Sequence, residues 1–100
     1  MSVIDRNIEK IRTLCNKHNV SKLFVFGSVL TDKYRQSSDI DFIVDFSEID
    51  IYDYADNYFN LKSSLEDLLN RQVDLLEEKA IRNPYLRQTI DSSKRLIYGQ

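Results

Sequence analysis

The sequence is poor in the residues that mark several large classes of protein. It has one cysteine, one proline, two glycines and no tryptophan among 100 residues. A single cysteine cannot form an internal disulfide, which fits a protein of the reducing cytoplasm. So little glycine and proline excludes collagen-like and linker-like chains, and a hydrophobic content of 42% excludes a disordered chain.

The sequence also lacks an excess of basic charge and a long apolar run. The 14 basic and 16 acidic residues give a net charge of −2, so direct nucleic-acid binding is not expected. No run approaches the roughly 20 apolar residues that span a bilayer, and the acidic N-terminus is not a signal peptide. We therefore expect a cytoplasmic protein with no membrane segment. The length predicts one domain over residues 1–100.

Helical signals are present in three segments. Apolar residues recur every three or four positions in the first and second of them. These are Ile4, Ile8, Ile11, Cys15 and His18 in the first, and Tyr54, Tyr58, Leu61, Leu65 and Leu68 in the second. The third helix is expected to start at Asn83 and Pro84, an N-cap followed by proline, and to end near Gly99.

Three short segments have strand character: residues 22–26, 39–46 and 72–77. They are short, apolar and rich in β-branched or aromatic residues, or they alternate between apolar and acidic positions. A short helical turn and a polar loop are expected between the first two strands. The order predicts an α/β (α+β) two-layer fold, in which a small mixed three-stranded sheet is flanked by helices.

Three aspartates are the strongest candidates for chemistry. Asp39 and Asp41 lie two residues apart, so a strand places both carboxylates on one face, about 6–7 Å apart. Like charges at that spacing repel unless a proton or cation intervenes, and Mg²⁺ prefers such ligands. Asp74 would join them if its strand lies beside the second strand, as a two-metal site requires. The alternative is that these acids lie on a solvated strand face.

Gly27 and Ser28 form a candidate phosphate site. They close the first strand and precede the expected helical turn. Glycine allows a close backbone approach, and the free N–H groups of a helix N-terminus favour an anion. The alternative is a plain strand-to-helix turn with a serine cap.

Taken together, these segments resemble the DNA polymerase beta-like nucleotidyltransferase superfamily, and within it the minimal nucleotidyltransferases (MNT). The residues on which the resemblance rests are FVFGS at 24–28, SSDIDFIV at 37–44 and VDLL at 73–76. The resemblance implies the nucleotidyltransferase fold and transfer of a nucleoside monophosphate from ATP, or another NTP, to a hydroxyl.

The resemblance also implies a role for each residue of the motif. Gly27 and Ser28 would bind the nucleotide triphosphate, and Asp39 and Asp41 would hold Mg²⁺. Asp74 would complete the metal site or act as the base toward the acceptor, so the three aspartates form both the catalytic and the metal-binding set.

A partner is implied as well. Small members of this family often pair with a HEPN-domain protein as toxin–antitoxin modules, and some add AMP to a tyrosine of the toxin.

The chain departs from active members at residues 29–32, which read Val-Leu-Thr-Asp in place of a basic, glycine-containing turn. The alternative is therefore an antitoxin of weak or no activity that acts by direct contact. A homo- or hetero-oligomer is compatible with both.

An aromatic segment follows the second strand: Tyr52, Tyr54, Tyr58 and Phe59. Helical spacing places about half of these side chains in the core. The others could form a face that binds a partner, since exposed aromatic residues favour interfaces. Both interpretations stay open from the sequence.

Overall fold

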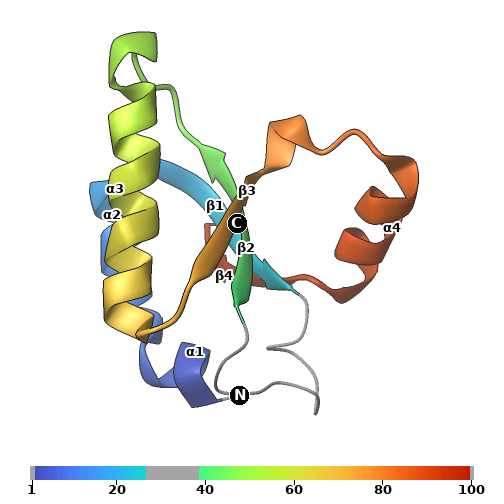
Figure 1. The fold of residues 1–100 in the computed structure, drawn as a ribbon, viewed down its shortest axis with the longest axis horizontal. Helices are drawn as coiled ribbons and strands as arrows, with labels where there is room; N and C mark the ends of the chain where they lie inside the picture. The colour runs from blue at the N-terminus through green and yellow to red at the C-terminus, as the bar shows by residue number, and fades with distance from the viewer. Residues whose placement is uncertain (1, 27–38, 100) are drawn as a thin grey trace.

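The computed structural model describes residues 2–26 and 39–99. The elements are, in chain order, α1 (Ser2–Arg6), α2 (Ile8–Lys17), β1 (Val20–Phe26), β2 (Ile40–Phe46), α3 (Ile51–Leu69), β3 (Val73–Glu77), the 3₁₀ turn η2 (Glu78–Ala80), α4 (Pro84–Ser93) and β4 (Arg95–Tyr98). α2 and α3 lie side by side on one side of the sheet, and α4 lies on the other (Figure 1). No helix within these ranges is long and apolar enough to cross a membrane.

The sheet is mixed, as expected, but within residues 2–26 and 39–99 it has four strands, in the order β3-β2-β1-β4. β1 is antiparallel to both β2 and β4, whereas β2 and β3 run parallel. The prediction of three strands was therefore wrong. The prediction that the last helix ends near Gly99 was also wrong, because α4 stops at Ser93 and β4 follows it.

The C-terminal strand has a clear physical cause. Lys94 leaves the helix with an extended backbone (φ −70°, ψ 149°), and Ile97 inserts into the core with 2% exposure. Gly99 then adopts φ +91° against β1, where a Cβ would lie 2.2 Å from the carbonyl oxygen of Ser21. Only glycine tolerates both that conformation and that approach.

α4 begins where the sequence predicts, and capping residues start both α3 and α4. Asp50 caps α3 by accepting the Tyr52 N–H at 2.9 Å, and Asn83 caps α4 by accepting the Tyr85 N–H at 2.9 Å. The N-terminal stripe forms two helices instead of one, separated at Asn7, whose side-chain amide donates to the Val3 carbonyl at 2.8 Å.

The two faces of the sheet are used differently. The face toward α2 and α3 carries the main core, which includes Ile40, Phe42, Val44, Val73 and Leu75. The opposite face carries an apolar row that crosses all four strands in register: Leu76, Ile43, Phe24 and Leu96. Because side chains alternate along a strand, the neighbouring row on this second face holds Asp41 and Asp74.

Candidate active site

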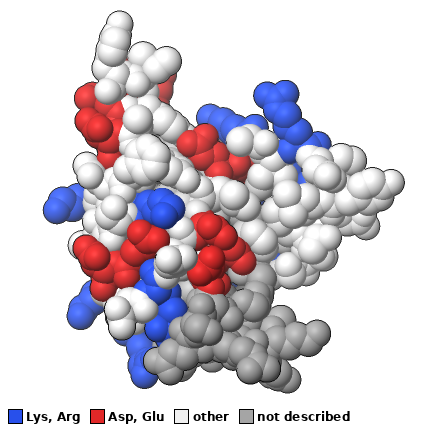
Figure 2. Space-filling view, in the orientation of Figure 1, with Lys and Arg blue, Asp and Glu red and all other residues white. Residues whose placement is uncertain are grey.

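Parallel pairing of β2 and β3 brings two of the expected aspartates together. Asp41 and Asp74 are direct partners in the register, and neighbouring strands lie about 4.8 Å apart. The Asp41 side chain is half-buried, whereas Asp74 and Asp39 are exposed. Figure 2 shows acidic side chains gathered near the middle of the visible face. The condition that the sequence left open, that the third strand lies beside the second, is met.

The carboxyl groups of Asp41 and Asp74 interact directly with each other. Burial is the largest of the effects that together raise the pKa of Asp41 from 3.8 to about 6; the others are a hydrogen bond with Asp74 and the negative charges of Asp74 and Asp39. Two carboxylates held this close repel each other when both carry a charge, and a bound cation would relieve that repulsion.

The donor set fits Mg²⁺, but not as a cage built from protein alone. In residues 2–26 and 39–99, no three His, Cys, Asp or Glu side chains are arranged to enclose a metal ion. Mg²⁺ is commonly held by one or two carboxylates together with substrate phosphates and water. Asp41 and Asp74, with Asp39 beside them, provide that kind of partial site.

Two further predicted residues cannot be placed. Gly27 and Ser28, the expected phosphate-binding residues, lie outside the described residues, as does the altered turn at 29–32. Their proposed role depends on the sequence pattern alone.

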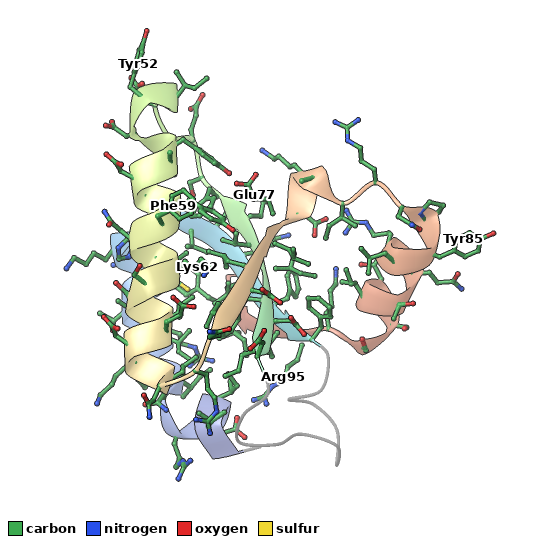
Figure 3. The ribbon with its side chains drawn as sticks, viewed as in Figure 1. Tyr52, Phe59, Lys62, Glu77, Tyr85 and Arg95 are labelled. Atoms are coloured by element: carbon green, nitrogen blue, oxygen red, sulfur yellow. The ribbon has the colours of Figure 1, made fainter. Side chains whose placement is uncertain are left out.

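A contact between α3 and β3 was missed by the sequence analysis. The Tyr58 hydroxyl donates to the Leu75 carbonyl, and a Glu66 carboxylate oxygen accepts the Val73 N–H at 3.0 Å. Lys62 pairs with the same Glu66 oxygen at 3.2 Å, and its side chain extends from the side of α3 nearest β3 (Figure 3). These bonds hold the residues on either side of Asp74. The helical spacing of Tyr58 predicts a core position but gives no signal for the bond that its hydroxyl makes.

A cavity lies elsewhere on the molecule. It measures about 470 Å³ and is lined by residues that include Phe46, Tyr54, Glu77 and Lys79. These residues lie at or beyond the carboxyl ends of β2 and β3, whereas Asp41 and Asp74 lie at the amino ends. The carboxylate pair is therefore not part of this cavity.

The aromatic segment divides between core and surface. Tyr54 and Tyr58 are half-buried, and the Tyr54 ring meets Phe46 edge-on with 5.5 Å between centroids. Tyr52 and Phe59 are 90% and 60% exposed. The first pair fits the core interpretation, and the second pair leaves an aromatic surface on α3.

The arrangement defines a class of protein: a small mixed sheet that presents paired carboxylates on one face. The model of the family described as polymerase beta, nucleotidyltransferase matches residues 9–100. The chain therefore belongs to the polymerase beta-like nucleotidyltransferase family, which confirms the resemblance drawn from its motifs.

Known proteins agree with that assignment. A candidate protein adenylyltransferase of Methanocaldococcus jannaschii, MJ0128, is 38% identical over 87 residues, which are 87% of this chain and 84% of the relative. The structure of a candidate minimal nucleotidyltransferase aligns with a TM-score of 0.77 and 30% identity over 95% of both chains. A chain from the complex of a tri-AMPylated HEPN toxin with an MNT antitoxin of Shewanella oneidensis shares the fold. Its TM-score is 0.67 at 21% identity, over 96% of this chain and 72% of that one.

Proposed function

We propose that this protein is a Mg²⁺-dependent adenylyltransferase that transfers AMP from ATP to a hydroxyl of a partner protein. The observation that carries the proposal is the carboxylate pair of Asp41 and Asp74, placed in register on adjacent strands of a nucleotidyltransferase fold. The relative named as a candidate protein adenylyltransferase supports AMP as the transferred group and a protein as the acceptor.

The residues of this chain have distinct parts in the proposed reaction. Asp39 and Asp41 hold the metal, and Asp74 either completes that site or accepts the proton of the acceptor hydroxyl. Gly27 and Ser28 bind the triphosphate through backbone N–H groups. The metal, when bound, neutralises the charge that develops on the phosphate oxygens.

The reaction balances as a single displacement. The acceptor oxygen forms a bond to the α-phosphorus of ATP as the bond from that phosphorus to the bridging oxygen breaks. The electron pair of the broken bond leaves with pyrophosphate. The hydroxyl proton passes to a base, for which Asp74 is well placed because it is the more exposed member of the pair. Positioning and charge stabilisation supply most of the catalysis in such transfers.

A HEPN-domain protein is the proposed acceptor and partner, with this chain as the antitoxin of the pair. The complex of an AMPylated HEPN toxin with an MNT antitoxin, which has the same fold, supports this assignment.

The proposal is tested by label transfer. The protein is incubated with α-labelled ATP, Mg²⁺ and a co-expressed HEPN-domain protein, beside an Asp39→Asn/Asp41→Asn double variant. A labelled partner band that the variant fails to produce supports an adenylyltransferase. No label with the wild type, under conditions in which the partner co-purifies, refutes catalysis.

A second candidate function is neutralisation by contact on the same fold. The exposed side chains of Ile51, Tyr52 and Phe59 on α3 favour it, since they offer an apolar surface for a partner. In that case a Tyr52→Ser/Phe59→Ser variant loses both partner binding and neutralisation. The Asp39→Asn/Asp41→Asn variant keeps both, which an enzymatic antitoxin would not.

A further inference from the structure

We infer that α3 positions the catalytic carboxylate pair: Tyr58 and Glu66 hold the β3 backbone on either side of Asp74 and so fix Asp74 against Asp41. This inference rests on the proposed function, because it assigns a role toward the same metal-binding pair. It makes Tyr58 and Glu66 positioning residues, since neither reaches the reacting atoms.

Among the strands that the structure describes, β3 lies at an edge of the sheet and has β2 as its one neighbour. In a parallel ladder, alternate residues direct their backbone groups toward the neighbouring strand. The Ile40 N–H donates to the Gln72 carbonyl at 3.0 Å, so Gln72 and Asp74 face β2. The backbone groups of Val73 and Leu75 therefore point away from the sheet, where β2 cannot hold them.

Glu66 holds the first of these two residues. Its carboxylate accepts the Val73 N–H at 3.0 Å and pairs with Lys62, one helical turn earlier, at 3.2 Å. The bond to the Val73 N–H lowers the pKa of Glu66, and Lys62 lowers it further, so the carboxylate is ionised at neutral pH. A charged acceptor makes a stronger hydrogen bond than a neutral one.

Tyr58 holds the second of these residues, Leu75. Its hydroxyl donates to the Leu75 carbonyl, and its half-buried ring packs against the core beneath the strand. Tyr58 and Glu66 are eight residues apart on α3, so they lie on one face about two turns apart, or about 12 Å. Val73 and Leu75 are two residues apart on β3. The two bonds therefore hold a short stretch of strand with Asp74 at its centre.

Protection of the sheet edge is the simpler role for the same bonds, because unpaired edge groups invite pairing with other chains. Both roles use bonds to Val73 and Leu75, because these residues direct their backbone groups away from β2. The two roles differ in a measurable way. Loss of a bond that only covers the sheet edge changes stability and self-association, whereas loss of a bond that positions Asp74 changes metal affinity in a folded monomer.

The test measures Mn²⁺ affinity by electron paramagnetic resonance, with Mn²⁺ alone as the probe. Tyr58→Phe removes only the hydroxyl, and Glu66→Ala removes the acceptor for Val73. Each is expected to weaken Mn²⁺ binding about tenfold, the lower end of the effect of residues that orient metal ligands. Glu66→Gln keeps an oxygen that accepts the Val73 N–H, so it should recover most of the affinity.

Matched controls come from the same helix. Tyr52→Phe removes a hydroxyl from an exposed tyrosine, and Asp67→Ala removes a carboxylate from the exposed position next to Glu66. Both should leave the Mn²⁺ affinity unchanged. All titrations are made at a temperature where circular dichroism shows every variant folded.

Each outcome decides a different question. If Asp41→Asn abolishes Mn²⁺ binding but Tyr58→Phe and Glu66→Ala bind as the wild type does, the positioning role is overturned and the proposed function stands. If the controls weaken binding as much as the test variants, the positioning role is also overturned. If the wild type binds no better than Asp41→Asn, the proposed metal site is overturned and the positioning role with it.

Discussion

Replacing Asp41 with asparagine should stabilise the metal-free protein at neutral pH. The folded protein raises the pKa of Asp41 from 3.8 to about 6, chiefly through burial and then through the hydrogen bond and charge of Asp74. A raised acid pKa means that the folded state holds its proton more tightly than the unfolded state does. The associated stability is complete below about pH 3.8 and is lost as the pH rises through about 6.

The size of the effect follows from that difference. A shift of about two pKa units corresponds to about 3 kcal/mol at 1.36 kcal/mol per unit. The carboxyl is half-buried, so solvent screening reduces this to about 1–2 kcal/mol. Asparagine is neutral at every pH and can still donate an N–H to Asp74. The melting temperature of the Asp41→Asn variant at pH 7.5 should therefore exceed that of the wild type by roughly 5–15 °C, and the difference should vanish near pH 4.

The assay is thermal unfolding in EDTA at pH 4 and pH 7.5, with Asp67→Asn as a control that removes one charge from an exposed site on α3. Adding Mg²⁺ and ATP at pH 7.5 should then stabilise the wild type and leave Asp41→Asn unchanged, because only a ligand of the folded state raises stability. Equal stabilities of wild type and Asp41→Asn at pH 7.5 without metal would refute the claim that Asp41 and Asp74 repel each other there.

Three further predictions concern the fold around the site. Cys15 is fully buried, and burial raises the pKa of its thiol to about 12. Iodoacetamide at pH 8 should therefore leave the Cys15 thiol unmodified until urea unfolds the chain, and mass spectrometry would detect the modification. Asn83→Ala removes the cap that accepts two N–H groups of α4 and should lower the free energy of unfolding by about 1 kcal/mol, whereas Asn16→Ala on the exposed side of α2 should not. Gly99→Ala forces a Cβ onto the Ser21 carbonyl at positive φ, so amide hydrogen exchange of β4 should speed up while that of β2 stays slow.

The parts of the fold that follow from local pattern were predictable. The alternation in residues 39–46 identified β2, and the pair Asn83-Pro84 identified the start of α4. The position of the aspartates within the sequence indicated a carboxylate site because acids are disfavoured in strands. These features depend on neighbours within a few residues, so a single sequence contains them.

The parts that depend on tertiary contact were not predictable. β4 is four residues long, and only its pairing with β1 separates it from the preceding helical segment. The register that places Asp41 beside Asp74 requires the parallel pairing of β2 and β3, which no local pattern fixes. The bond from Tyr58 to Leu75 likewise depends on how α3 packs against β3 in the folded chain.

Both edge strands of the sheet carry side-chain bonds that a partner would have to displace in order to add a strand. On β3 these are the bonds from Tyr58 and Glu66, and on β4 the Arg12 side chain donates to the Ile97 carbonyl at 3.1 Å. Strand addition at either edge would therefore exchange existing hydrogen bonds for new ones, with little net gain. A partner that docks instead on the exposed side chains of α3, or on the face of the sheet that bears Asp74, displaces none of them. That leaves the carboxylate pair open to an incoming hydroxyl while the edges that hold it in place stay intact.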